Sequence, residues 1–451
     1  MRERLAAAAL LALALFPPPL AAAEDDEPLS LASLGLKGTA IYKNFSHFDT
    51  TRDDPQLIRN EGLIRLEFAR RLAPWLETRL VGQVQKDDDD LTDGVNFQIQ
   101  DKNPRRSVLD LKEAVLTLRG GPLDIALGKQ IFAWGTADAF NPTDNLNAYD
   151  YMDPFDSERL GGEKLGLWSA AFRLTAGATT ATFVVVPAFV PSRLPLPRSR
   201  WVPEIPPGFV GAAGDREVPG ISAGNVQYAA RVRTTLRGVD VSASYYDGFE
   251  HVPVLRVSSL PVGPGASIPL FTPVYTRVKV PGLDISTTYG KFELHAETAA
   301  RFVESNGPED RWQGVAGFNY TWDAPLPGVE QVVFLAEYAR EIILHTRPSS
   351  NILPLDGVPG LGDLLSSRIF REALIGRALV KLSEDTQVKL TAVLDLDSAP
   401  NAYVQPKVTH RLTDAFQVES GLDLFAAGEP DSHWGRYRKN NRVFVFLKYF
   451  F

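Results

Sequence analysis

Apolar and polar side chains alternate at every second position along most of this chain. Residues 64–68 read Ile-Arg-Leu-Glu-Phe, and residues 292–298 read Phe-Glu-Leu-His-Ala-Glu-Thr. A period of two is typical of β-strands, because successive side chains point to opposite faces of a sheet. The second face of these runs often carries charge, which indicates water rather than a packed core on that side.

Runs of this kind follow one another after the first 35 residues, and we count about 18. They are residues 36–46, 57–71, 76–85, 108–119, 122–132, 164–175, 179–190, 225–237, 239–250, 278–289, 291–303, 311–322, 329–342, 369–383, 385–396, 402–412, 415–425 and 441–451. An even number of strands brings both ends of a barrel to the same side. Because Pro281 and Gly282 interrupt one run, 16 strands stay an alternative.

The connections between the runs alternate between short turns and long loops. Short turns are expected near residues 72–74, 120–122, 176–178, 237–239, 290, 323–328, 383–385 and 412–415. Long loops are expected at about 47–56, 86–107, 133–163, 191–224, 251–277, 304–310, 343–368, 397–401 and 427–440. This asymmetry is typical of outer-membrane barrels, with short periplasmic turns and long extracellular loops. The predicted fold class is therefore an all-β, transmembrane antiparallel β-barrel, and a secreted soluble β-sandwich is the disfavoured alternative.

The start of the chain has the pattern of a secretory signal. Arg2 and Arg4 precede a short apolar run, and the alanines at 21–23 offer a cleavage site. The run is shorter than the ~20 apolar residues of a spanning helix. We therefore expect a signal peptide at 1–23, a short periplasmic segment at 24–35 and the barrel at 36–451, in the outer membrane of a Gram-negative bacterium. We expect no separate plug domain, because the expected barrel begins at residue 36.

The last predicted strand is rich in aromatic residues and ends at Phe451. Leu447, Tyr449 and Phe451 share one face at a period of two, which we expect to meet lipid. This end of the chain is similar to the C-terminal strand through which the barrel-assembly machinery recognises outer-membrane barrels. These three residues are the candidate insertion signal.

The composition narrows the classes of function. Against 47 Lys and Arg the chain has 55 Asp and Glu, and this net charge of -8 disfavours nucleic acid as a partner. The absence of cysteine excludes disulfides and thiolate metal sites. None of the six histidines lies in a catalytic motif, so we expect no enzyme, no catalytic residue, no cofactor and no metal. The acid-rich stretches 87–93 and 138–156 lack EF-hand spacing and are interpreted as solvated loops rather than calcium sites.

Charges expected on the inward faces are the candidates for ion selectivity. They are Glu113, Arg231, Arg233, Glu293, His295, Glu297, Arg371 and Arg377. The favoured interpretation is a lumen of mutually paired charges with little net preference. The alternative is segregation into a cationic wall and an anionic wall. The register of the strands, which decides between the two, cannot be deduced from the sequence.

The segment 133–163 combines aromatic, turn-forming and acidic residues. Its candidate constriction residues are Trp134, Gly135, Asp138, Asn141, Pro142 and Asp144. Asn, Pro and Asp favour turns, and the aromatic residues can pin a loop to the barrel wall. We interpret the segment as a loop folded into the lumen and held by hydrogen bonds to inward charges such as Glu113. An ordinary extracellular loop packed on its neighbours is the alternative.

The same segment resembles the domain-of-unknown-function 1302 family of Gram-negative outer-membrane β-barrel proteins. The resemblance covers residues 108–160 and rests on Leu-Lys-Glu-Ala at 111–114, Gly-Lys-Gln at 128–130, Trp-Gly at 134–135 with Asp138, and Asn-Pro at 141–142 with Asp144. It implies a β-barrel without an assigned substrate and offers no catalytic residues. Alginate-export and specific porin barrels show a weaker similarity.

The predicted function is a porin-like channel or transporter for passive passage of a small solute or a hydrophobic, lipid-like molecule. The alternative is an outer-membrane outlet for an exported polymer or lipid that works with periplasmic partners. The loops 191–224, 251–277 and 343–368 are apolar or proline-rich. We interpret them as a lid over the mouth or, alternatively, as a capture site for a hydrophobic substrate. An arginine cluster at 193–200 either gates the mouth or binds lipopolysaccharide phosphates; a stiff surface loop is the favoured interpretation.

The expected partners follow from this location. They are outer-membrane lipid and lipopolysaccharide, the barrel-assembly machinery through the C-terminal strand, and a transported substrate whose identity the sequence does not give. No nucleic acid is expected. Assembly into a homo-oligomer stays open, because pores of this size occur both as trimers and as monomers.

Overall fold

The structure of this protein is a computed structural model. It describes residues 35–51, 53–89, 91–156, 162–197, 199–202, 211–304, 307–347, 351–353, 371–397, 401–430 and 432–451. The predicted signal peptide at 1–23 and the periplasmic segment, apart from its last residue, lie outside the described residues, as does most of the predicted loop 343–368.

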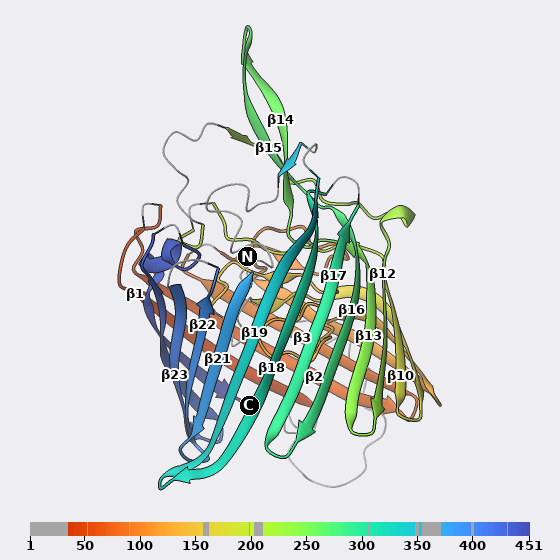
Figure 1. Cartoon of the computed structure of the whole chain (residues 1–451), viewed down its shortest axis with the longest axis vertical. Helices are drawn as coiled ribbons and strands as arrows, with labels where there is room; N and C mark the ends of the chain where they lie inside the picture. The colour runs from red at the N-terminus through yellow and green to blue at the C-terminus, as the bar shows by residue number, and fades with distance from the viewer. Residues whose placement is uncertain are drawn as a thin grey trace, which may run out of the picture. The chain divides into compact units, whose positions relative to one another are not determined.

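Residues from Leu36 onward form a closed barrel of 18 antiparallel strands (Figure 1). The barrel strands are β1 (Leu36–His47), β2 (Ile58–Ala73), β3 (Leu76–Asp87), β5 (Leu109–Gly120), β6 (Leu123–Gln130), β9 (Leu167–Ala176), β10 (Thr179–Val186), β12 (Gln227–Leu236), β13 (Val239–Phe249), β16 (Arg277–Tyr289), β17 (Phe292–Val303), β18 (Glu309–Leu326), β19 (Val329–Thr346), β21 (Glu372–Lys381), β22 (Thr386–Asp395), β23 (Asn401–Thr413), β24 (Phe416–Ala427) and β25 (Arg442–Phe450). Each of the 18 predicted runs corresponds to one of these strands.

The barrel closes between its first and last strands. Each barrel strand pairs with the next one along the chain, and β25 returns to pair with β1, where Tyr42 lies opposite Leu447. Backbone hydrogen bonds between Gly38 and Phe451 extend this seam, and closure removes the free sheet edges that would otherwise lack partners.

The alternative of 16 strands is wrong, because the doubtful run forms β16. Pro281 pairs with Tyr245 of β13, and the register with β17 omits Pro281. A proline lacks the backbone N–H that a central strand would donate, so the ladder tolerates it only where one side is left unpaired.

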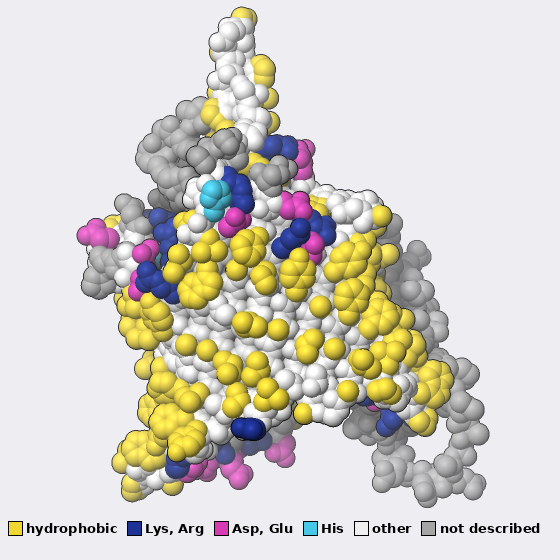
Figure 2. All heavy atoms as spheres, turned by 45° about the vertical axis from the view of Figure 1, so that its right-hand side comes forward, with side chains coloured by type: hydrophobic (Ala, Val, Ile, Leu, Met, Phe, Trp, Pro, Cys, Tyr) yellow, Lys and Arg dark blue, Asp and Glu magenta, His cyan; other side chains and the backbone are white. Residues whose placement is uncertain are grey.

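The two faces of the strands follow the predicted alternation. On β2, Arg65 and Glu67 point into the barrel and bond to interior groups, whereas Ile64 and Leu66 are exposed on the outside. Figure 2 shows apolar side chains spread over the outer face, with charged side chains gathered toward its two ends. Exposed aromatic residues lie near both ends of the strands: Tyr42, Tyr228, Tyr245, Phe302 and Tyr338 at one end and Tyr289, Phe292, Trp322 and Tyr449 at the other. An apolar band between aromatic girdles is the outer surface of a transmembrane barrel.

One end of the barrel carries only short turns in the described chain, as predicted. We call it the short-turn end, and the opposite end, which carries the long loops, the long-loop end. The turn between β12 and β13 consists of Arg237 and Gly238, whose φ angles of 53° and 85° are both positive. Two positive φ angles are the conformation of a type I′ hairpin turn, which matches the twist of antiparallel strands.

The predicted loop 251–277 contains a hairpin instead of irregular chain. The strands β14 (Val254–Gly263) and β15 (Ala266–Val274) pair with each other and project from the long-loop end (Figure 1). The short strands β11 (Ala212–Ala213) and β20 (Ile352–Leu353) extend this sheet to four strands. A tight turn around Gly265, with a φ of 71°, makes the hairpin possible in a stretch whose prolines had suggested a loop.

Other small elements lie in the long loops. The strand β4 (Val95–Asn96) adds to β5, and β7 (Tyr149–Asp150) pairs with β8 (Glu163–Lys164). In the described chain, the 3-10 helix η1 (Ala223–Asn225) precedes β12, and the 3-10 helix η4 (Gly435–Asn440) precedes β25. Among the described residues, no helix is long and apolar enough to cross a membrane.

Candidate functional site

The candidate site is a loop that runs through the interior of the barrel. It connects β6 to β9 over residues 131–166, of which 157–161 lie outside the described part, and it is called the interior loop below. Its backbone bonds to side chains on the inward faces of β17 and β19, across the barrel from β6. The segment that the sequence predicted to fold inward therefore lies inside the barrel.

Glu297 on β17 binds the first half of the interior loop through both of its carboxylate oxygens. One oxygen, Oε2, accepts the backbone N–H of Thr136 at 2.9 Å and that of Ala137 at 3.3 Å. The other, Oε1, accepts the backbone N–H of Thr143 at 2.7 Å and its hydroxyl at 2.8 Å. Hydrogen bonds to an ionised acceptor are roughly twice as strong as neutral ones, so this carboxylate is a strong anchor.

Gly135 is required at its position by the same anchor. Its φ is +89°, and a Cβ there would overlap the carboxylate of Glu297. Only glycine adopts this backbone conformation without strain and leaves room for the carboxylate.

Glu337 on β19 provides a second anchor beside the first. Its Oε1 accepts the backbone N–H of Asp138 at 2.6 Å, and its Oε2 accepts that of Ala139 at 3.1 Å. The Nε2 of His295 lies 2.9 Å from Oε1, on the same inward face of the barrel wall. Two neighbouring carboxylates thus bind successive turns of the interior loop.

The side chain of Asp138 reaches the same wall. Its carboxylate accepts hydrogen bonds from Asn319 at 3.0 Å and from Arg377 on β21 at 2.9 Å. Burial favours the neutral acid, but these two donors outweigh burial and hold the pKa of Asp138 below its usual range. The structure therefore brings together Asp138, His295 and Arg377, which the sequence nominated separately.

Asp138, His295 and Glu337 have ligand atoms within 4.8 Å of one another, close enough to share a metal ion. The atoms that would bind the metal already have other partners, however. The oxygens of Glu337 accept backbone N–H groups, and the guanidinium of Arg377 pairs with Asp138. A cation would have to displace a guanidinium that already compensates the charge. The group fits a hydrogen-bonded cluster better than a metal site.

The remaining predicted loop residues each have a separate set of partners. Trp134 is buried, and the guanidinium of Arg231 lies 6.0 Å from the centre of its ring. Asn141 donates to the carbonyl of Ala137 at 2.6 Å and closes the turn that Pro142 continues. Asp144 forms an ion pair with Lys164, near the point where the interior loop returns to β9.

The second half of the interior loop binds the opposite wall, near the β1–β25 seam. Asp153 pairs with Arg59 at 2.8 Å and with Arg442 at 2.7 Å, and Arg442, fully buried, also pairs with Asp423 at 2.7 Å. The two guanidiniums outweigh the effect of burial and hold the pKa of Asp153 well below its usual range. The interior loop therefore bridges two walls that lie on opposite sides of the barrel.

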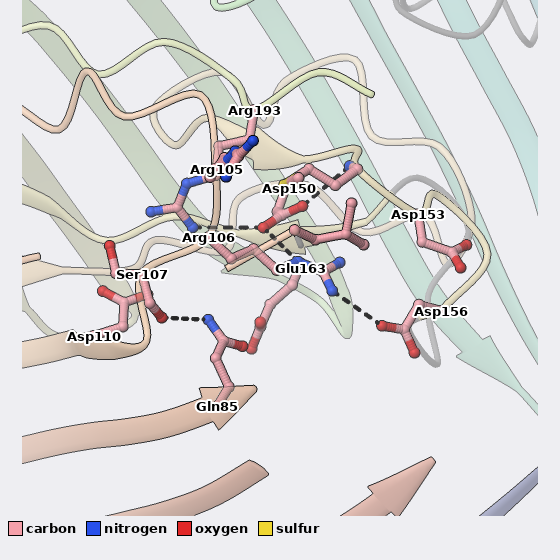
Figure 3. Close-up of polar contacts among 12 residues, drawn as sticks. Gln85, Arg105, Arg106, Ser107, Asp110, Asp150, Asp153, Asp156, Glu163 and Arg193 are labelled. Carbon is pink, nitrogen blue, oxygen red and sulfur yellow. Dashed lines mark hydrogen bonds and ion pairs between the residues drawn. The ribbon is translucent and has the colours of Figure 1, made fainter. Parts of the chain in front are cut away.

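Asp150 and Asp156 extend this network to the loop between β3 and β5. Arg106 lies 3.0 Å from Asp150 and 3.5 Å from Asp156, and Figure 3 shows its guanidinium between the two carboxylates. Arg193 lies 3.5 Å from Asp150 and also pairs with Asp101. Arg193 is thus buried among carboxylates rather than exposed on a surface loop, and Arg200 pairs with Asp54 at 3.1 Å; Arg198 lies outside the described residues. Gating of the mouth or binding of lipopolysaccharide by this cluster stays a prediction.

An aromatic cluster fills the interior on one side of the loop. The ring of Phe155 lies 4.7 Å from that of Tyr403, 5.0 Å from Phe425 and 5.2 Å from Trp201. Trp434, near η4, closes the cluster at 6.1 Å. Rings at these distances and tilts exclude water, so the wall of β21–β24 is packed near the long-loop end.

The other side of the loop is hollow. A cavity of about 520 Å³ lies between the interior loop and β25, β1, β2, β3 and β5. A second cavity of about 490 Å³ lies toward the short-turn end between β2, β3, β5, β6 and β9, and Ile131 lines both. On the aromatic side, a cavity of about 230 Å³ separates the loop from β19, β21, β22 and β23. Of these three cavities, which described residues line, the two larger ones therefore adjoin one wall of the barrel.

The predicted lumen charges are mostly paired with near neighbours. Arg231 pairs with Asp284 at 3.1 Å and Arg233 with Asp240 at 2.6 Å. The strands β13 and β16 separate the Arg231 strand from the strand of Glu293 and Glu297, so these groups do not form facing walls.

One expectation about an individual charge needs correction. Glu113 does not hold the interior loop: it lies 3.4 Å from Arg79 on the neighbouring strand, and Glu297 and Glu337 make the contacts expected of it. Arg371 lies just before β21, in the alternation of the inward Ile375 and Arg377, and pairs with Asp397 at 3.5 Å. Its role as a lumen charge stays a prediction.

The residues of the C-terminal strand take the predicted faces. Leu447 and Tyr449 alternate with the inward Phe446 and Lys448, and Lys448 pairs with Glu419 at 2.6 Å inside the barrel. Phe451 donates to and accepts from the backbone of Gly38. Their role as an insertion signal stays a prediction.

Sequence reasoning missed several residues that bind the interior loop. Lys43, Arg59, Glu61 and Arg106 all belong to the network around Asp153 and Asp156. A signal existed for two of them, because Arg59 and Glu61 continue the inward face of Arg65 at a period of two. No such signal exists for Arg106, which lies in an irregular loop.

A short sequence near β12 matches a hydrolase motif. Residues 220–224 read Gly-Ile-Ser-Ala-Gly and so carry the letters of the G-x-S-x-G hydrolase motif. That motif needs its serine on a tight turn between a strand and a helix, above an oxyanion hole. Ser222 is instead an exposed residue before the three-residue helix η1, and its side chain makes no capping hydrogen bond. The local structure does not support a nucleophile there.

Comparisons with known proteins agree with the barrel architecture. Neither a protein-family model nor a curated protein matches the sequence. Among solved structures, OccAB3 of Acinetobacter baumannii is 8% identical with a TM-score of 0.49, over 92% of this chain and 98% of that chain. A BenF-like porin from Pseudomonas fluorescens is 8% identical with a TM-score of 0.47, over 92% and 97%. OmpF of Salmonella typhi is 11% identical with a TM-score of 0.41, over 92% and 97%.

The features of the chain itself define it as a transmembrane β-barrel protein: it has a closed 18-stranded antiparallel barrel, an apolar outer face and a charged interior. Membership of the domain-of-unknown-function 1302 family stays a prediction.

Proposed function

We propose that this protein is a passive channel of the outer membrane of a Gram-negative bacterium, with the interior loop as its constriction. A small solute crosses on the hollow side of that loop, along β1–β6. The observation that carries the proposal is the pair of cavities on either side of Ile131, which follow one another from the interior loop toward the short-turn end. The packed aromatic side supports the same route, because it leaves less space for a solute.

The charged side chains along this route are paired, so we expect only weak selectivity between cations and anions. The exposed arginines Arg65 and Arg79 line the two cavities, but each faces carboxylates within 3.4 Å. A permeant therefore meets both signs of charge at close range. Polar solutes that exchange hydrogen bonds with such pairs fit this lining better than lipid-like molecules do.

The interior loop can be released without changing the barrel wall. In Glu297→Gln, one of two oxygens that accept N–H groups becomes an NH₂ group, which faces a donor whichever way the amide is turned. The same holds for Glu337→Gln. We expect the double variant to show a higher and noisier single-channel conductance in a planar bilayer than the unchanged protein.

Glu293→Gln is the matched control. Glu293 lies on the same inward face of β17, and its nearest cross-strand partners are Thr288 and Asn319 rather than the loop. It should leave the conductance level unchanged. Equal conductance of the double variant and the control, in protein that migrates as a folded barrel, would refute the interior loop as the constriction.

A further inference from the structure

The apolar outer band of the barrel is short on one side. The strands β6 and β10 have 8 residues each, whereas β18 and β19 have 18. At ~3.3 Å per residue and a tilt of ~45°, 8 residues rise about 19 Å, less than the ~25 Å apolar band of outer-membrane barrels. The wall of β6, β9 and β10 therefore leaves a notch at the long-loop end.

A segment of the loop between β3 and β5 lies across this notch. Its strand β4 pairs with Leu109 and Asp110 of β5, beyond the point where β6 ends its own pairing with β5 at Ala114. The carbonyl of Gln98 accepts a hydrogen bond from the ring N–H of Trp168, the second residue of β9, at 3.2 Å. Gln100 then donates to the carbonyl of Phe189, just past β10, at 3.0 Å.

The two faces of this segment differ in polarity. Asn96 is buried and donates to Asp110 at 2.9 Å and to Asp101 at 3.0 Å. The alternate residues Val95, Phe97 and Ile99 are exposed by 52%, 54% and 54%. Val95 lies opposite Leu109, whose side chain is on the outer face of β5, so these three side chains form an apolar ridge on the outside of the barrel.

The segment that crosses the notch covers the side chain of Lys129 on β6. By register it lies beside Trp168 and Ala114 on the outer face of β6, yet it is only 3% exposed. Its ammonium lies 3.7 Å from Asp110, the carboxylate that also binds Asn96. Without cover, an ammonium at this position would lie at the edge of the apolar band, where charge is unfavourable.

We propose that the ridge of Val95, Phe97 and Ile99 is a lipid-contact surface, which completes the apolar band above β6, β9 and β10. Its partner is the acyl-chain region of the outer leaflet. Below the segment, the wall continues on the same outer face: Leu127 lies two residues before Lys129 on β6, Phe172 lies four residues after Trp168 on β9, and both are exposed. The inference rests on the proposed location of the barrel in a membrane.

Because the chain has no cysteine, single spin labels can be introduced cleanly. We expect a label at Phe97→Cys, in the full mature chain reconstituted in liposomes, to collide with oxygen more than with a water-soluble nickel chelate. A label at Leu127→Cys, inside the band, should show the same preference, and one at Ser258→Cys, on the projecting hairpin, should show the opposite. Ile99→Cys replaces Phe97→Cys if that variant does not fold.

The possible outcomes test the lipid-contact ridge separately from the location of the barrel in a membrane. Preference for the nickel chelate at Phe97 and Ile99, with oxygen preference retained at Leu127, would overturn the lipid-contact ridge but not the membrane location. Nickel preference at Leu127 as well would overturn both. An oxidative cross-link between two chains at Phe97→Cys in the membrane would also overturn the proposal, because the ridge would then face a second copy.

Discussion

Asp153 joins the interior loop to the place where the barrel closes. Its two cationic partners, Arg59 and Arg442, lie on β2 and β25, the strands that flank β1. The guanidinium of Arg442 also lies over the ring of Phe45 at 4.2 Å and over that of Trp201 at 5.0 Å. This one buried group therefore connects the β1–β25 seam, the interior loop and the aromatic cluster. Removing one member of such a set leaves a charge that water cannot reach.

Asp153→Asn should therefore destabilise the folded barrel. We expect a loss of about 3–5 kcal/mol in the free energy of unfolding, typical of a broken buried ion pair. Since the pKa of Asp153 is lowered in the fold, its contribution is present above the unfolded value of about 4 and is lost only as pH falls below that value. The stability gap between the two proteins, measured by urea titration in detergent, should be wide at pH 7 and narrow below pH 4.

Arg233→Gln is the control for this prediction. Its side chain is 55% exposed and pairs with Asp240, and exposed pairs contribute about 0–1 kcal/mol. A loss at Asp153→Asn no larger than that at Arg233→Gln would contradict the role of Asp153 as a structural link.

At this scale the sequence predicted which residue types face the lumen better than which partners they meet. Alternation places Glu297, His295 and Arg377 on inward faces, and turn chemistry identifies Asp138 and Asn141 as loop formers. The pairing of Asp138 with Arg377 joins residues 239 positions apart. Such a pair depends on the curvature and closure of the whole sheet, which no local pattern encodes.

Whole elements were the most predictable level of this structure. All barrel strands could be located because each must present one face to lipid and the other to water, and this requirement repeats at every second residue. The ends of strands were less predictable: β18 and β19 reach residues 309 and 346, beyond the predicted runs, because they extend past the apolar band. In the loop 86–107, Val95, Phe97 and Ile99 alternate as in a strand. The run of aspartates just before them favoured a solvated loop instead.

The β14–β15 hairpin stands apart from the barrel. It pairs with β11 and β20 rather than with a barrel strand. Near its base, Leu255 and Phe271 contact the aromatic cluster, whereas Val262 at the tip is exposed.

Deleting residues 258–270 and joining Val257 to Phe271 with an Asn-Gly turn should leave the barrel intact, since that turn suits a two-residue hairpin. We expect an unchanged thermal midpoint and unchanged conductance in a planar bilayer. A large loss of either would show that the hairpin is a lid packed over the mouth. Reduced binding of a fluorescent fatty acid with unchanged conductance would instead favour the capture site.

The molecule as a whole is an asymmetric barrel. The interior loop divides its interior into a packed side, built on β21–β24, and a hollow side along β25 and β1–β6. Carboxylates hold this division in place. Glu297 and Glu337 of one wall bind the first half of the loop, and Asp153 and Asp156 of the second half bind Arg442 and Lys43 of the other wall. The sequence could indicate a loop inside the barrel but not its sidedness, which arises from contacts among aromatic residues that lie far apart in the sequence.

The most direct test of this account is chemical block of single-cysteine variants during a conductance recording. A bulky thiol reagent should reduce the single-channel conductance of Ile131→Cys, which lines both large cavities, and leave that of Thr391→Cys unchanged, since Thr391 lines the smaller cavity on the packed side. Block at Thr391→Cys with no effect at Ile131→Cys would place the route on the opposite side of the loop and contradict the account.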